Sequence, residues 1–144
     1  MKTLMFTLVL LTSISAFART PYDTLIKSCE FGRGECHIQK YNVSKFDYKA
    51  EAKKITANLN ETEIPYFKRN DVYDAIYSIA GFEDGSDAFF NNLSKLFKTN
   101  KIQATFGIAP HPEKCTESEY CSSVSATIFT NDGYIISIYF DYNT

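Results

Sequence analysis

The chain has 144 residues, which is the size of a single domain. Its 15 lysines and arginines and 17 aspartates and glutamates give a formal charge of -2, which excludes a strongly basic nucleic-acid-binding protein. Hydrophobic residues make up 44% and charged residues 22%, proportions typical of a globular protein rather than a disordered one.

The N-terminus has the pattern of a signal peptide. Lys2 precedes an apolar run from Leu4 to Leu11 that only Thr7 interrupts, and Ala16-Phe17-Ala18 forms a small-x-small cleavage pattern. The apolar run is shorter than the about 20 residues of a transmembrane helix, which disfavours a membrane anchor. We therefore expect cleavage before Arg19 and a single exported domain over residues 19–144, secreted or periplasmic and free of the membrane.

All four cysteines, Cys29, Cys36, Cys115 and Cys121, lie in the expected mature chain. An even number of cysteines in a short exported chain indicates two disulfides. The short spacings favour the pairs Cys29–Cys36 and Cys115–Cys121, although the sequence leaves all three connectivities open. Neither spacing matches the C-x2-4-C pattern of structural zinc sites, so we expect no metal ion and no other cofactor.

The middle third of the chain predicts a first helix after Val43. Ser44 to Asp47 form a Ser-x-x-Asp start pattern, with Ser44 as the expected N-cap. Beyond this cap, the apolar residues recur on one helical face down to Leu59, where the chain approaches Pro65. The residues of that face are Tyr48, Ala52, Ile55 and Leu59.

Two further helices are predicted before residue 100. One runs from Asp71 to Ala80, with Gly81 as its expected left-handed stop. The other follows the Asp84-Gly85 turn, with Ser86 as its expected cap and an apolar stripe facing the core. That stripe consists of Phe89, Phe90, Leu93, Leu96 and Phe97.

The last third changes from helical periodicity to strand alternation. Apolar and polar residues alternate from Ile102 to Ile108 and from Val124 to Phe129, and the strongest strand pattern runs from Tyr134 to Tyr142. The sequence thus predicts an α+β domain with about three helices followed by an antiparallel sheet of about three strands, stapled by disulfides.

The turn Asn131-Asp132-Gly133 predicts the register of the last hairpin. A two-residue loop would place Ile128 opposite Ser137, whereas a three-residue loop places it opposite Ile136. The second register pairs apolar side chains on one face and puts Gly133 at a left-handed bulge position. We therefore expect the three-residue loop.

No catalytic motif stands out along the chain. It lacks the G-x-S-x-G, H-E-x-x-H and phosphate-loop patterns. The alternative is a small secreted hydrolase in which the two histidines, His37 and His111, act as general acid and base. Pairing between the two cysteine regions could bring these histidines together.

A binding function is favoured over catalysis. The chain has ten tyrosines and twelve phenylalanines, and tyrosine is enriched at recognition surfaces. In the expected register Phe129, Ile135 and Tyr139 share the second face of the hairpin, where either a helix covers them or a partner protein binds. We expect an exported, non-catalytic binding protein, such as an inhibitor or protective partner of another secreted protein, while the oligomeric state stays open.

The signal peptide leads to a first testable prediction. The exported chain should begin at Arg19, because cleavage follows the Ala16-Phe17-Ala18 pattern. Intact-mass measurement of the exported material should give the mass of residues 19–144 with all four cysteines oxidised. A chain that retains Met1 would contradict the assignment.

Overall fold

The computed structural model describes residues 19–111, 113 and 123–142. The strands are β1 (Gly34–Lys40), β2 (Glu63–Tyr66), β3 (Ile102–Pro110), β4 (Ser123–Thr130) and β5 (Tyr134–Asp141). The helices are α2 (Asp23–Ser28), α3 (Tyr48–Thr56), α4 (Arg69–Ala80) and α5 (Ser86–Phe97), with a short 3-10 helix η1 (Val43–Lys45). The domain is therefore of mixed α and β structure, as predicted.

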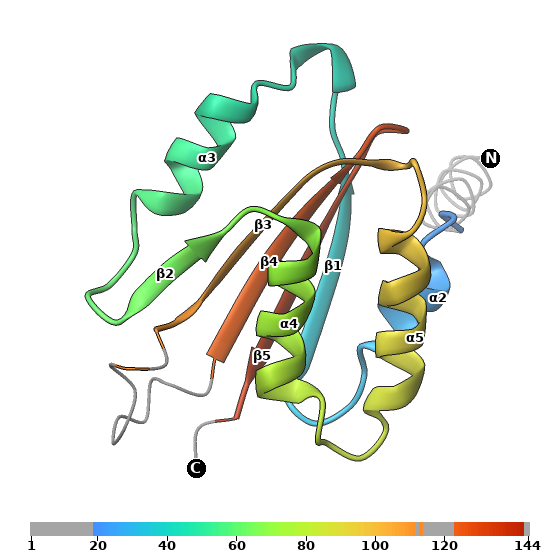
Figure 1. Cartoon of the computed structure of the whole chain (residues 1–144). Coiled ribbons are helices and arrows are strands. Elements are labelled where there is room, and N and C mark those ends of the chain that lie inside the picture. The colour runs from blue at the N-terminus through green and yellow to red at the C-terminus, as the bar shows by residue number, and fades with distance from the viewer. Residues whose placement is uncertain (1–18, 112, 114–122, 143–144) are drawn as a thin grey trace, which may run out of the picture.

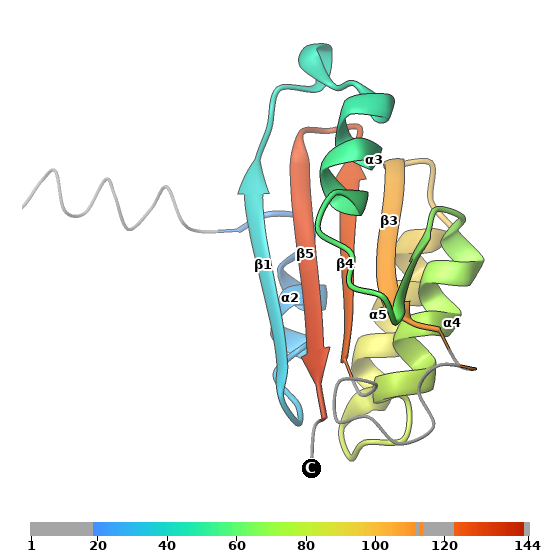
Figure 2. The same ribbon diagram turned by 90° about the vertical axis from the view of Figure 1, so that its left-hand side faces the viewer.

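The strands form one antiparallel sheet in the order β1-β5-β4-β3-β2, which two helical layers enclose. The helices α2, α4 and α5 pack on one face, which we call the inner face (Figure 1). The single helix α3 lies over the opposite, outer face (Figure 2). Since α3 is short, it covers only one end of the outer face.

The sheet has five strands rather than the predicted three or so, because β1 and β2 were not recognised. The inner face of β1 carries only two apolar side chains, Cys36 and Ile38, so its alternation is weak. β2 is four residues long and contains Pro65. Proline cannot donate a backbone hydrogen bond, but β2 is an edge strand, where this loss is tolerated.

The predicted hairpin register is confirmed. Ile128 pairs with Ile136, and the same register extends to the two apolar pairs that follow along β4 and β5. Gly133 has a φ of +98°, the left-handed conformation that the three-residue loop requires. The inner-facing residues of β5, namely Ile136, Ile138 and Phe140, are all fully buried.

The predicted apolar faces of α4 and α5 build the main core. Val72 and Ile76 of α4 and Phe89 and Leu93 of α5 are completely inaccessible to solvent, as the 3.6-residue periodicity predicts. At the far end of the helix pair, the guanidinium of Arg69 donates hydrogen bonds to the carbonyl oxygens of residues 97 and 99, at 2.9 and 3.1 Å. The start of α4 is thereby joined to the end of α5.

Several predicted helix ends are wrong in detail. Ser44 does not cap α3 but lies in η1, and the N-cap of α3 is Asp47, whose carboxylate accepts from the amide of Ala50 at 3.2 Å. Helix α3 ends at Thr56 rather than near Leu59 because the chain then turns toward β2.

The turn between α4 and α5 also differs from the prediction. Gly81 is right-handed, with a φ of -66°, and the left-handed residue is Gly85. Gly85 rather than Ser86 occupies the N-cap of α5. Ser86 is buried in the first turn, where its hydroxyl donates to the carbonyl oxygen of Gly81 at 3.1 Å.

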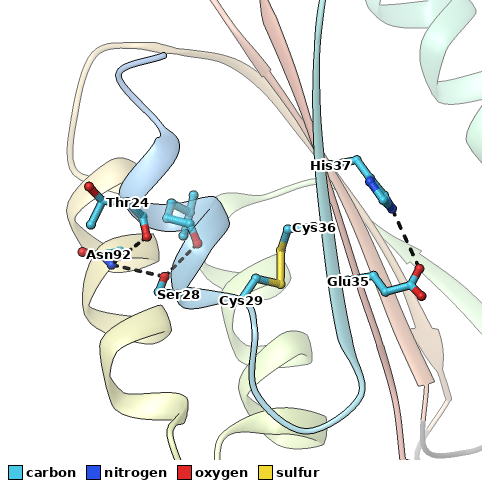
Figure 3. Close-up of a disulfide and its surroundings, with 8 residues drawn as sticks. Thr24, Ser28, Cys29, Glu35, Cys36, His37 and Asn92 are labelled. Atoms are coloured by element: carbon cyan, nitrogen blue, oxygen red, sulfur yellow. Dashed lines mark hydrogen bonds and ion pairs between the residues drawn. A yellow bond between two sulfur atoms is a disulfide. The ribbon is translucent and has the colours of Figure 1, made fainter. Parts of the chain in front are cut away.

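The Cys29–Cys36 disulfide is formed as predicted and joins the end of α2 to β1 (Figure 3). Its Cα atoms are 6.0 Å apart, and a closed loop of this length should stabilise the fold by about 2.5 kcal/mol through lost unfolded-state entropy. The expected partners Cys115 and Cys121 lie outside the described residues.

A hydrogen bond joins the start of the domain to the hairpin turn. The Tyr22 hydroxyl donates to the carboxylate of Asp132, whose two oxygens lie 2.9 and 3.0 Å away. Burial and this hydrogen bond raise the pKa of Tyr22 to about 12. The neutral phenol is therefore the form that the fold stabilises.

Truncation of inner-facing and outer-facing side chains of β5 should have different effects on the stability of the fold. Ile138→Ala should lower the free energy of unfolding by about 2–5 kcal/mol, because it empties a fully buried aliphatic site. The adjacent Ser137→Ala, on the outer face, should change it by less than about 0.5 kcal/mol. Denaturant unfolding measures both variants, and equal losses would contradict the inner and outer assignment.

The Tyr22 hydrogen bond should make part of the unfolding free energy depend on pH in the alkaline range. Tyr22→Phe should lower the unfolding free energy by about 1.5–3 kcal/mol, the value of a hydrogen bond to a charged group. The folded-state pKa is raised, so this contribution is fully present below pH 10.0 and is lost as the pH rises to about 12.

Denaturant unfolding across that pH range measures the difference between wild type and Tyr22→Phe, which should shrink with rising pH. The matched control is Tyr77→Phe at a half-exposed position, which should change stability by less than about 0.5 kcal/mol. A difference that grows with pH would contradict the assignment.

Candidate functional site

The part of the outer face that α3 leaves uncovered is the candidate site, and we call it the open sheet face. Side chains on one face of an antiparallel sheet lie opposite each other across neighbouring strands, with Cβ atoms about 5 Å apart. On this face Tyr139 of β5 lies between Glu35 of β1 and Ser125 of β4. In the adjacent row, Ser137 lies between His37 and Thr127.

Tyr139 is the most prominent side chain of the open sheet face. It is 42% exposed, whereas its neighbours in the chain, Ile138 and Phe140, are buried in the core. Its hydroxyl donates to the carboxylate of Asp141 at 3.4 Å. The strand alternation of β5 thus presents one large aromatic ring to the outside.

The surroundings of Tyr139 are acidic. Partial burial, followed by the nearby charge of Asp141, raises the pKa of Tyr139 above its ordinary value. The carboxylates of Glu35 and Glu63 act in the same direction. Asp141 on β5 itself and Glu35 on the adjacent β1 are the closest sources of this negative charge, whereas β2, which carries Glu63, lies three strand spacings from β5.

Glu35 and His37 extend from β1 on the side opposite the disulfide (Figure 3). His37 Nε2 lies 3.8 Å from a carboxylate oxygen of Glu35, and the two side chains are 77% and 69% exposed. A pair exposed to this extent stabilises the fold very little. Both side chains are thus accessible at the rim of the open sheet face.

This arrangement is suited to binding a cation. An aromatic face attracts an ammonium or guanidinium group, and nearby carboxylates add charge attraction and accept its hydrogen bonds. The hydroxyls of Ser125, Thr127 and Ser137 supply neutral donors and acceptors beside the ring.

The three residues predicted as the partner site do not form one exposed patch, although Phe129 and Ile135 pair directly across β4 and β5. Phe129 is 4% exposed, because Tyr41 and Phe46 pack on it at ring distances of 5.3 and 4.9 Å. Ile135 is partly buried against the same outer cluster. Of the predicted residues, Tyr139 is the one that stands exposed.

The two histidines of the alternative function are not brought together. His37 lies in the edge strand β1, whereas His111 follows β3, where its amide donates to the carbonyl oxygen of Thr62 at 2.6 Å. Three strand spacings separate β1 from β3, which amounts to about 14 Å across the sheet. The distance is too long for both rings to contact one reacting group.

Within residues 19–111, 113 and 123–142, no group of three or more His, Cys, Asp or Glu side chains is placed to hold a metal ion. In that part of the chain, no helix has the length and apolar character needed to cross a bilayer.

The sequence reasoning missed an aromatic surface on the outside of the α4–α5 layer. Tyr73 and Tyr77 are stacked one helical turn apart, with ring centroids 6.3 Å apart. Phe82, in the turn after α4, lies 5.8 Å from the Tyr77 ring and is 84% exposed. The available signal was the spacing of the two tyrosines at i and i+4, directly beside the core face of Val72 and Ile76.

No protein-family model matches the chain, and no curated protein or solved structure is significantly similar to it.

Proposed function

We propose that the chain is an exported, non-catalytic binding protein whose open sheet face holds a basic segment of another exported protein. In that role it acts as an inhibitor or protective partner, since a small rigid domain that occupies a partner's surface blocks or shields it. Export is supported by the signal-peptide pattern of residues 1–18. The Cys29–Cys36 disulfide is compatible with an oxidising compartment.

One observation carries the proposal, namely the exposed ring of Tyr139 with the carboxylates of Glu35 and Asp141 beside it. A lysine or arginine over this ring would gain about 0.5–2 kcal/mol from the cation–π interaction. The carboxylates of Glu35 and Asp141 would steer a positively charged segment toward the ring and exclude acidic partners.

The rigid framework favours binding without rearrangement. Tyr139 lies between two buried residues of a strand that is paired on both sides, and its backbone position is therefore well determined. A preformed site loses little conformational entropy when a partner binds. No comparable observation favours the hydrolase alternative, because His37 and His111 lie apart.

The proposal predicts a specific loss of partner binding. Tyr139→Ser should weaken binding of the partner by about 10-fold or more, because aromatic anchors dominate interface energetics. Glu35→Gln should weaken it less and should reduce the salt dependence of binding, since it removes one steering charge. Both are measured by titrating the wild-type and variant chains against the partner isolated from the native exported fraction.

Phe82→Ser is the matched control because it also removes an exposed aromatic ring, but on the opposite side of the domain. It should leave the affinity for that partner unchanged. Binding that survives Tyr139→Ser and is lost with Phe82→Ser would overturn the assignment of the open sheet face.

A further inference from the structure

β1 is an edge strand that is long enough to pair with a further strand. β5 lies on one side of β1, and no described strand lies on its other side (Figure 2). β1 has seven residues, contains no proline and pairs with β5 without a register shift. The opposite edge strand, β2, has four residues and contains Pro65. Proline, short length and bulges are the features that block an edge, and β1 has none of them.

The backbone groups of Cys36, Ile38 and Lys40 point outward from this edge. The amide of Tyr41 donates to the carbonyl oxygen of Gly133, its partner when the β1–β5 register is continued by one pair. In an antiparallel ladder, residues that bond to the neighbouring strand alternate with residues whose N–H and C=O groups point the other way. The odd-numbered residues of β1 therefore bond to β5, as residue 41 does. Within the described residues, no backbone hydrogen bond outside the strand pairs involves the three outward-pointing residues.

The side chains of β1 determine what an added strand would meet on each face of the sheet. On the inner face, Cys36 and Ile38 pack against the main core and are only partly buried. On the outer face, the side chain of Glu35 is 69% exposed. Glu35 pairs directly with Tyr139 of β5, so the row that contains both residues ends at this edge. An added strand would therefore fit best if its apolar side chains alternate with polar ones that include a cation.

We propose that the basic segment of the exported partner binds as an extended strand along β1. Its apolar residues face the inner side, and a lysine or arginine stands in the row of Glu35 and Tyr139. This inference rests on the proposed function, since it names the conformation and the residue pattern of the segment that the open sheet face holds. The backbone of the segment pairs with the outward groups of β1 and extends the five-stranded sheet by one strand.

Charge favours a basic segment over other occupants of the edge. A basic side chain opposite Glu35 meets this carboxylate first and points toward the Tyr139 ring, which belongs to a strand two spacings, about 10 Å, away. An acidic side chain at the same position would be repelled by Glu35. A second copy of the chain would offer its own β1, whose outer face carries Glu35, His37 and Gln39 and no lysine or arginine. The second copy therefore lacks the complementary charge.

Residue-resolved amide hydrogen exchange of the exported chain, with its disulfides intact, tests the added strand. The probe is the acetylated and amidated peptide Val-Thr-Val-Lys-Val-Thr-Val, which has the length of β1 and carries its lysine on the polar face. In the free chain, the amides of Cys36, Ile38 and Lys40 should exchange faster than those of His37 and Gln39, which bond to β5. The peptide at about 1 mM should slow the three outward amides about 10-fold, which corresponds to a dissociation constant of about 100 µM.

Substitutions in β1 separate the backbone contribution from the charge contribution. Ile38→Pro removes one outward donor without breaking a bond to β5, and it should weaken peptide binding about 5-fold. Thermal unfolding verifies that this variant retains the fold. Glu35→Gln should weaken binding about 2- to 5-fold, and so should a peptide with glutamate in place of its lysine. The matched control is Glu83→Gln, in the turn between α4 and α5, which should leave binding unchanged.

The outcomes distinguish this inference from the proposed function. Changes at the Tyr139 ring without slower exchange in β1 would overturn the added strand and leave the proposed function standing. A peptide that changes neither β1 nor Tyr139 would also overturn the added strand, whereas the proposed function is tested on the partner itself by Tyr139→Ser. Equal binding of the lysine and glutamate peptides would contradict the basic segment. Slower exchange of the outward amides in concentrated chain without peptide would assign the edge to a second copy and overturn the inference.

Discussion

The register of β5 against β4 is the constraint on which both faces of the domain depend. Ile128 meets Ile136, and the alternation of β5 then buries Ile138 and Phe140 under the helices. The same alternation turns Tyr139 outward between Glu35 and Ser125. A slip of one residue would exchange the two faces, so the burial that stabilises the core also determines the exposed site.

The two faces of the sheet are covered unequally. On the inner face, α2, α4 and α5 pack over the sheet and build the main core (Figure 1). On the outer face, α3 and the segment before it cover Phe106 and Phe129, whereas Tyr139 is 42% exposed. The open sheet face is therefore the part of the sheet that the helices leave available for the proposed binding.

The sequence correctly predicted the elements in which the local residue pattern agrees with the position of the element in the fold. The hairpin was correct because Gly133 and the apolar residues on both strands require the same register. β1 was missed because its burial depends on pairing with the distant β5, and β2 because Pro65 is acceptable only at an edge. Tyr139 is the residue of the candidate site that the sequence predicted as a binding residue. Its carboxylate neighbour on β1 becomes adjacent through the order of the strands, which a local sequence pattern does not contain.

Side-chain footprinting of the exported chain most directly tests the claim that the open sheet face is the binding surface. Solvent reactivity would be compared for the free chain and for the chain bound to its exported partner. The partner should protect Tyr139 and should leave Tyr77 and Phe82 as reactive as they are in the free chain. Protection of Tyr77 and Phe82 by the partner, with Tyr139 unchanged, would contradict it.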